Sequence, residues 1–457
     1  MSKQHISYVP HVPSTESSSR TYSRLSALVS IGMVLGVGFD LTRPFGSDWL
    51  RPTFILVFPC VVLLWLRHPS LAFSSTKTWA ARLMLGMCLL ALLGHVAGTD
   101  VFSYWSGTVA MYEPTAIAGM YICFVAGMCI GKQERLTRVA SGSLLLVVAV
   151  HSAAVLFSQN SIRHQGTIRS TGLHDDPNIV LAYILLPLCF AIPWARLRRH
   201  YLLLLIVSIL AVGATLSTVS KMGLVALVVM GVSAAGVILT ERTRRWRGLQ
   251  HVVVLTMIIV LAGIFVWTLF PEYVSEVADS YSKRIEAAQR RASASVLEER
   301  LRWVDVIKLQ DWMSLERLYG SGYSADNLPH NSFLDMYFST GIPGLVAMLL
   351  LVGSALWGNA NAFRGFSSSR EMRKATGSAV LGIVVLSIII SALSICTLKL
   401  CWFLVGLAHG VLVRANSCRC VTTGRCISVS LSRDHSPTKL VYTGMTAYLR
   451  SPEKGRL

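Results

Sequence analysis

The stretch 163–178, RHQGTIRSTGLHDDPN, gathers ionisable side chains directly before an apolar run. Arg163 and Arg169 supply guanidinium groups, whose fixed fork of N–H donors matches phosphate oxygens. Asn178 ends the stretch, at the entry to a predicted helix. These residue types indicate an anion-binding segment, and an ordinary solvated loop of the same composition is the alternative.

Lys221 lies in the sharp turn 217–223, STVSKMG, between two long apolar runs. It is a second candidate for binding an anion. The alternative is a lysine whose stem lies along the membrane surface while its ammonium group reaches water.

His330 and Asn331 lie where a long hydrophilic segment returns to an apolar run. Neutral imidazole accepts a proton near neutral pH, so His330 is a candidate general base for a hydroxyl group. Asp175 and Asp176 are the second choice for this base. A histidine that only marks the membrane boundary is the alternative without chemistry.

Two arginines, Arg300 and Arg302, precede Trp303 in the same hydrophilic segment. In a regular helix, residues two positions apart point about 200° away from each other. Only one of these arginines can therefore face a given site, and the sequence leaves open which one.

The composition indicates that membrane-spanning helices position these residues. Of the 457 residues, 53% are hydrophobic and 14% are charged, against about 25% charged in soluble domains. The apolar runs approach the roughly 20 residues that a spanning helix needs, and they lack the alternation of barrel strands. The net charge is +19, but Lys and Arg cluster at the ends of the runs. This pattern favours membrane topology and an anionic ligand over nucleic acid.

We predict an all-α membrane protein with about twelve transmembrane helices. Their ranges are 25–41, 53–66, 82–98, 115–131, 139–157, 179–194, 201–219, 222–240, 251–270, 333–357, 376–396 and 398–413. Residues 1–24 would form an N-terminal tail, 25–413 the membrane domain and 414–457 a basic C-terminal tail. The long segment 271–332 would be a largely helical loop between the ninth and tenth spans.

Lys and Arg are frequent in the connections after the even-numbered spans and sparse in the others. By the positive-inside rule, both termini are cytoplasmic and the 271–332 loop is periplasmic. Long loops translocate regardless of charge, so the basic residues of that loop do not contradict this topology. We expect a multi-pass protein of the bacterial inner membrane, in contact with membrane lipids.

The sequence lacks a Walker A loop, HExxH, GxSxG and a DxD-type nucleotide-sugar site. This argues against ATP or a cytosolic nucleotide sugar as substrate, and we expect neither a metal nor a cofactor. A site on the outer face needs a substrate that is already activated and already across the membrane. Lipid-linked sugar pyrophosphates meet both conditions.

Four motifs in order resemble those of the O-antigen ligase and polymerase superfamily. They are Arg169, Gly172, Pro177 and Asn178; then Ser220, Lys221 and Gly223; then Arg300, Trp303, Gly320 and Gly322; and finally His330, Asn331, Gly341 and Gly344. The resemblance covers roughly 165–350. Lys221 stands where the family usually has an arginine, which keeps the charge but loses the bidentate fork.

The resemblance implies a metal-independent glycosyltransferase of the GT-C type. Such an enzyme moves a glycan from undecaprenyl pyrophosphate to a hydroxyl group of lipid A-core (a ligase), of a second lipid-linked glycan (a polymerase) or occasionally of a protein. Arg169 and Arg300 would hold the pyrophosphate and His330 would act on the acceptor hydroxyl. The substrate-binding residues would be Arg163, Asn178, Lys221, Arg302 and Asn331.

Two other classes compete with an enzyme. A flippase or other transporter of lipid-linked oligosaccharides would place charged residues inside the spans and often show internal repeats. In this chain, ionisable residues are few within the spans and no internal repeat is convincing, which favours the enzyme. A membrane scaffold without chemistry is the second rival.

Overall fold

A computed structural model describes most of the predicted membrane domain. The described residues are 16–40, 52–98, 112–157, 161–164, 167–174, 176–197, 201–239, 332–365, 370–393 and 398–423, with isolated positions between 268 and 286. The chain divides into two units, Met1–Ser417 and Cys418–Leu457. The helices that position the candidate residues belong to the first unit.

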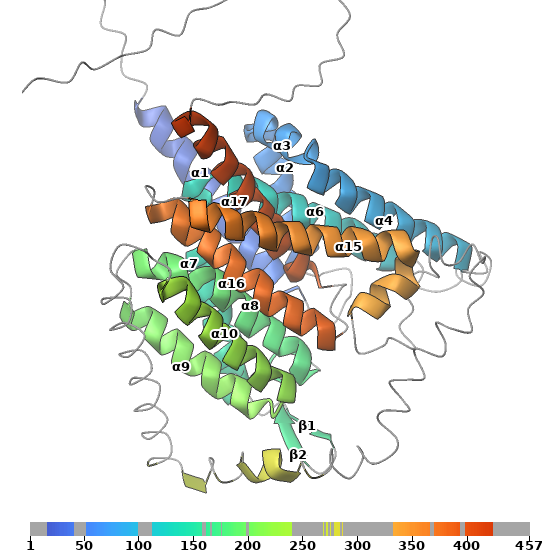
Figure 1. Cartoon of the computed structure of the whole chain (residues 1–457), viewed down its shortest axis with the longest axis vertical. Helices are drawn as coiled ribbons and strands as arrows, with labels where there is room; N and C mark the ends of the chain where they lie inside the picture. The colour runs from blue at the N-terminus through green and yellow to red at the C-terminus, as the bar shows by residue number, and fades with distance from the viewer. Residues whose placement is uncertain are drawn as a thin grey trace, which may run out of the picture. The chain divides into compact units, whose positions relative to one another are not determined.

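These helices form a bundle in which segments far apart in the sequence pack side by side (Figure 1). They are α1 Glu16–Gly38, the π-helical turn η2 Thr53–Val57, α2 Phe58–Arg67, α3 Pro69–Thr76, α4 Trp79–Gly98, α6 Tyr112–Lys132, α7 Glu134–Phe157, α8 Pro177–Leu197, α9 Tyr201–Ser217, α10 Lys221–Leu239, α15 Ser332–Gly365, α16 Arg370–Ala392 and α17 Lys399–Thr423.

The prediction of an all-helical membrane protein is confirmed in its main statement. Within the described ranges, four helices are long and apolar enough to cross a membrane: Glu134–Phe157, Thr340–Gly365, Glu371–Ser391 and Lys399–Cys418. A bent pair, Ile55–Arg67 with Pro69–Thr76, would be a fifth span. Every other predicted range except 251–270 also coincides with a helix, and 251–270 lies almost entirely outside the described residues. The count of twelve spans stays a prediction.

A β-hairpin lies between α7 and α8, in a connection for which the sequence predicted no secondary structure. β1 (Ser161–His164) and β2 (Thr167–Ser170) pair antiparallel, with Ser161 opposite Ser170 and Ile162 opposite Arg169. Each strand carries one apolar, β-branched residue, Ile162 or Ile168, among polar residues. This short pattern is hidden in a segment that is otherwise polar.

The tenth predicted span is kinked, at the glycine pair that the sequence had singled out. Gly341 has φ +69° and ψ −172°, which are not helical values, and Pro343 follows inside α15. Proline lacks the N–H that would continue the helical hydrogen bonds. The segment Ser332–Thr340 therefore runs in a different direction from the rest of α15.

Glycines bring α6 and α17 into backbone contact. A Cβ atom added at Gly127 would overlap the carbonyl oxygen of Phe403, and one added at Gly406 would overlap that of Phe124. Gly131 and Gly410, one turn further along each helix, repeat the arrangement. Small residues spaced by four are the usual means by which membrane helices approach this closely.

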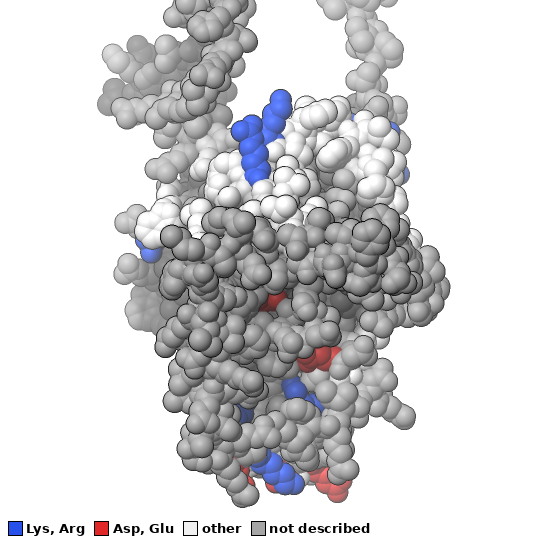
Figure 2. All heavy atoms as spheres, turned by 90° about the vertical axis from the view of Figure 1, so that its right-hand side faces the viewer, with Lys and Arg blue, Asp and Glu red and all other residues white. Residues whose placement is uncertain are grey.

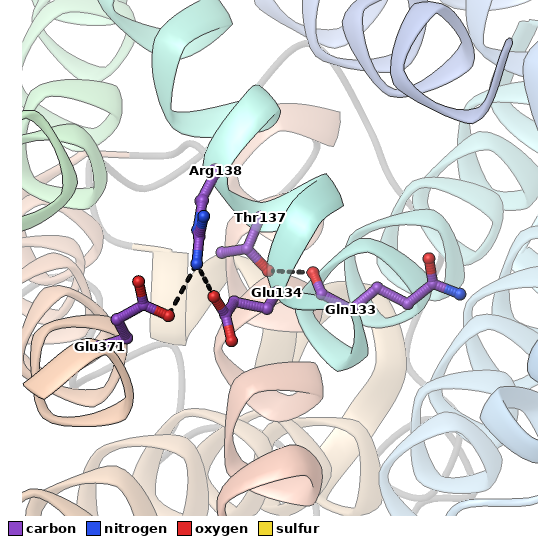
Figure 3. Close-up of polar contacts among 5 residues, drawn as sticks. All are labelled: Gln133, Glu134, Thr137, Arg138 and Glu371. Atoms are coloured by element: carbon purple, nitrogen blue, oxygen red, sulfur yellow. Dashed lines mark hydrogen bonds and ion pairs between the residues drawn. The ribbon is translucent and has the colours of Figure 1, made fainter. Parts of the chain in front are cut away.

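At the far end of α7 from the hairpin, charged residues join α7 to α16 (Figure 3). Arg138 Nη2 lies 2.7 Å from Glu371 Oε2 and also contacts Glu134, one turn earlier on α7. Thr137 Oγ1 donates to the carbonyl oxygen of Gln133 at 2.8 Å. The three charged side chains are 33–42% exposed, so each pair contributes at most about 1 kcal/mol. We interpret this group as structural.

Gly127→Ala should destabilise the protein by roughly 1–3 kcal/mol, because the new Cβ has a backbone atom in its place and α6 must move away from α17. The matched control is Gly142→Ala in α7, where an added Cβ meets nothing within 4 Å. It should be neutral or slightly stabilising, since alanine has the higher helix propensity. Thermal unfolding in detergent measures both. Equal effects of the two variants would contradict the close helix contact.

Candidate functional site

Three segments that the sequence analysis singled out meet at the hairpin end of the bundle. Arg169, on β2, donates from Nε to the carbonyl oxygen of Thr218 and from Nη2 to Asn178 Oδ1, both at 2.9 Å. Ser220 Oγ donates to the same oxygen of Asn178 at 3.0 Å. We call these four residues the Arg169 cluster. It ties the hairpin to the start of α8 and to the turn between α9 and α10 (Figure 1).

The Arg169 cluster is nearly closed to solvent. Arg169 is 4% exposed, and Thr218 and Ser220 are buried as well. A buried guanidinium group needs hydrogen-bond acceptors, because the loss of its hydration is costly. The carbonyl of Thr218 and the amide of Asn178 supply two of them, so Arg169 has a structural role in addition to any role toward a ligand.

Asn178 is fixed by the beginning of α8. Pro177 is the first residue of this helix, a position where the missing N–H costs nothing. Asp176 precedes it and accepts the backbone N–H of Asn178 at 2.7 Å, as an N-cap residue does. Asp176, one of the two alternative bases, thus uses one carboxylate oxygen to cap the helix.

The turn between α9 and α10 is held in an unusual backbone conformation. Val219 has φ +48°, which a β-branched residue adopts only under strain. Ser220 caps α10 by accepting the N–H of Gly223 at 3.4 Å. Lys221 is the first residue of α10 and is exposed. The turn therefore presents a lysine ammonium group beside a helix N-terminus.

Gly172 explains the spacing of the Arg-x-x-Gly motif. Its φ of +61° lies in the left-handed region that glycine adopts without strain. A Cβ added there would lie 2.9 Å from Val155 Cγ2 and 3.1 Å from the backbone nitrogen of Val155. The turn after β2 can therefore lie directly on the end of α7, which leaves Arg169 pointing toward α8 and the α9–α10 turn.

A column of stacked rings lies behind this turn. The ring centroid of His174 lies 4.7 Å from that of Tyr183 and 5.0 Å from that of His151, which is 5.1 Å from Phe39. His151 Nε2 lies 2.8 Å from the carbonyl oxygen of Gly38 and is the donor there. Burial, with a smaller contribution from His151, lowers the pKa of His174 to about 3, so its ring is neutral at physiological pH.

A buried ion pair joins the ends of two other helices. Lys399 Nζ lies 2.9 Å from Asp40 Oδ2 and 3.2 Å from Oδ1, and the side chains are 2% and 3% exposed. Lys399 is the first residue of α17, at the beginning of the predicted span 398–413, and it lies inside the bundle. Its stem covers Gly119 on α6.

The other predicted site residues are only partly described. Arg163 lies on β1 opposite Ile168, and its side chain lies outside the described part. Asp175, Arg300, Arg302, His330 and Asn331 also lie outside the described residues. The first described residue after Asn331 is Ser332, which donates to the carbonyl oxygen of Leu393. Within the described ranges, no three His, Cys, Asp or Glu side chains come together as a metal site would require.

No protein-family model matches the sequence, and no curated protein matches it. The site is therefore interpreted from its own residues.

The double-mutant cycle of Asn178→Ala and Ser220→Ala tests the Arg169 cluster. Asn178→Ala should cost roughly 2 kcal/mol, because it removes the acceptor of a buried guanidinium group, and Ser220→Ala roughly 1 kcal/mol. The double variant should lose less than the sum, because the Ser220 bond needs Asn178. Thermal unfolding in detergent measures the four states.

The control pairs Asn178→Ala with Ser387→Ala. Ser387 donates only within α16, to the carbonyl oxygen of Ile383. This second cycle should be additive within about 0.5 kcal/mol. Additivity in both cycles would mean that Asn178 and Ser220 do not interact in the folded protein.

Proposed function

We propose that the chain is a membrane glycosyltransferase that resembles the O-antigen ligases and polymerases. It would move a glycan from undecaprenyl pyrophosphate to an acceptor hydroxyl on the periplasmic face of the bacterial inner membrane. The observation that carries this proposal is that Arg169 and Ser220 both donate hydrogen bonds to Asn178 Oδ1 in the Arg169 cluster. The resemblance selected Arg169 and Asn178 from one motif and Ser220 from the next, without information about contact between the two motifs. A single site requires that the two motifs lie side by side.

The surface beside the Arg169 cluster suits an anionic donor. An exposed Lys221 stands at the N-terminus of α10, where the helix dipole also favours negative charge. Arg169 lies behind it and adds positive charge from a buried position. In this proposal Lys221 binds the pyrophosphate, and Arg169 orients Asn178 and the turn between α9 and α10. A direct contact of Arg169 with phosphate stays a prediction, since two of its donor groups already have acceptors.

The remaining chemistry belongs to predicted residues outside the described part. Arg300 or Arg302, with Arg163 and Asn331, would complete the binding of the donor. His330 would take the proton of the acceptor hydroxyl as its oxygen attacks the anomeric carbon. The C–O bond to the pyrophosphate breaks in the same step, and the cationic side chains stabilise the departing charge.

We extend the proposal to the topology of twelve spans, with both termini cytoplasmic and a largely helical periplasmic loop at 271–332. The connection between α6 and α7, with Lys132 and Arg135 close to Arg138, lies at the opposite end of α7 from the hairpin. An end rich in Lys and Arg is the cytoplasmic end by the positive-inside rule. This supports a periplasmic position of the Arg169 cluster.

Reporter fusions at Ser293 and Ser368 test this topology. Ser293 lies in the 271–332 loop and Ser368 in the connection between α15 and α16. The two fusions should give opposite compartment signals. The same signal from both would contradict the topology.

Transfer by the purified protein tests the function. With a lipid-linked glycan donor and an acceptor, the wild type should transfer glycan without added metal. His330→Ala should lose at least about a hundredfold in turnover, because general-base help contributes typically 10²–10⁴-fold, while donor binding changes little. Arg169→Lys should retain little activity, because a lysine cannot reproduce two hydrogen bonds in fixed directions. Arg135→Lys, at the exposed opposite end of α7, is the control.

The outcomes separate the roles. Full activity of the Arg169 and His330 variants, at normal protein levels, would contradict the proposal. Should His330→Ala lose donor binding together with activity, His330 would belong to the pyrophosphate site and the base would be Asp175 or Asp176.

A transporter of lipid-linked oligosaccharides is the second candidate, and the Asp40–Lys399 pair is the observation that favours it. Charged residues inside a bundle often mark a transport path. This pair, however, joins the end of α1 to the beginning of α17 and does not lie at mid-helix. If the purified protein moved the lipid-linked donor from one leaflet of a vesicle membrane to the other and transferred no glycan to an acceptor, the transporter would be favoured.

A further inference from the structure

The chain makes a sharp elbow after α2. The chain direction bends by 111° between the helices Ile55–Arg67 and Pro69–Thr76, a little more than a right angle. His68 lies at the bend, with φ −132° and ψ +62°, and its ring lies 3.1 Å from Ser26 Oγ on α1. If α2 crosses the bilayer, α3 runs almost parallel to the membrane surface.

Contacts with α6 and α4 hold the elbow in place. Ala72 and Ser75, three positions apart on α3, are buried, so one face of this short helix packs inward. Lys132, at the end of α6, donates to Ser74 Oγ at 3.2 Å. Thr78 accepts the N–H of Ala81 at 3.2 Å, which caps α4 directly after α3. The elbow is thus a fixed part of the bundle.

The outward side of the elbow combines aromatic and basic residues. Trp65, Phe73 and Trp79 are 42%, 64% and 54% exposed. Arg67, Lys77 and Arg82 are exposed as well, and the sequence from 52 to 98 contains no Asp or Glu. We call these six residues the elbow surface. Figure 2 looks from the side of Figure 1 on which α2, α3 and α4 lie, and it shows a largely uncharged described surface with Lys and Arg side chains projecting at its upper end.

We propose that the elbow surface binds the head-group region of the bilayer, with an anionic phospholipid as its partner. Tryptophan side chains favour the boundary between hydrocarbon and water. Basic residues beside an apolar helix face attract anionic head groups, and no acidic side chain of this segment opposes them. The elbow belongs to the same end of the bundle as the α6–α7 turn, which is cytoplasmic in the proposed topology.

Native mass spectrometry of the detergent-purified protein, titrated with phosphatidylglycerol or phosphatidylcholine, tests the proposal. The wild type should bind phosphatidylglycerol more tightly. The variant Arg67→Gln, Lys77→Gln, Arg82→Gln should lose about fivefold in affinity for each residue removed, which corresponds to about 1 kcal/mol per basic residue near an anionic surface. The three losses together are on the order of a hundredfold, and binding of phosphatidylcholine should not change.

The matched control is Arg24→Gln, Arg135→Gln, Arg364→Gln. It removes the same charge from three exposed positions outside the elbow surface: within α1, at the beginning of α7 and at the end of α15. This control should bind phosphatidylglycerol as the wild type does. A second variant, Phe73→Ala with Trp79→Ala, should weaken the binding of both lipids.

Equal losses in the elbow variant and the control would overturn the proposal, since general charge attraction would then explain the binding. Equal affinity of the wild type for both lipids would also overturn it and would favour an acidic protein as the partner. All variants change exposed side chains, and their thermal unfolding shows whether they fold. Because lipid binding is measured directly, the result does not depend on whether the chain transfers glycans.

Discussion

The guanidinium group of Arg169 is the contact on which the hairpin end of the bundle depends. One side chain joins β2, the beginning of α8 and the turn between α9 and α10, which are held together by its bonds to Asn178 and Thr218. Each of these segments has its own reason to be in place: Gly172 lets the hairpin approach α7, Asp176 caps α8, and Ser220 caps α10. The arginine couples three local structures into one, at the cost of burying a charge.

This coupling also accounts for the strain at Val219. A left-handed conformation at a β-branched residue persists only where its surroundings determine it. The neighbouring carbonyl of Thr218 accepts from Arg169, and the neighbouring side chain of Ser220 donates to Asn178. The strained residue therefore lies between two residues that are both fixed by the Arg169 cluster. Lys221 follows Ser220 in the chain, so its position depends on the positions of Thr218 and Ser220.

Much of the helical layout could be predicted from the sequence, because long apolar runs are typical of membrane-spanning helices. Arg169, Asn178 and Ser220 were also identified from residue type and motif order. The Thr218 carbonyl was not, since a backbone acceptor carries no signal in the sequence. His151 and His174 lie 23 positions apart in separate segments, so their stacking depends on tertiary packing. The Asp40–Lys399 pair was not predicted, because a charge at the end of an apolar run has the same pattern whether it reaches water or an aspartate inside the bundle.

The contact between α6 and α17 constrains how the bundle can change shape. Where two backbones touch through Gly127, Gly131, Gly406 and Gly410, there are no side chains between them that could change rotamer to accommodate sliding. The stem of Lys399 lies on the same face of α6, at Gly119, and its ammonium group is bound to Asp40. These contacts oppose sliding of the two helices past each other. Any widening that admits a molecule with a long hydrocarbon tail has to occur between other helices, such as α9 and α10, whose outward leucine, isoleucine and valine side chains can rearrange.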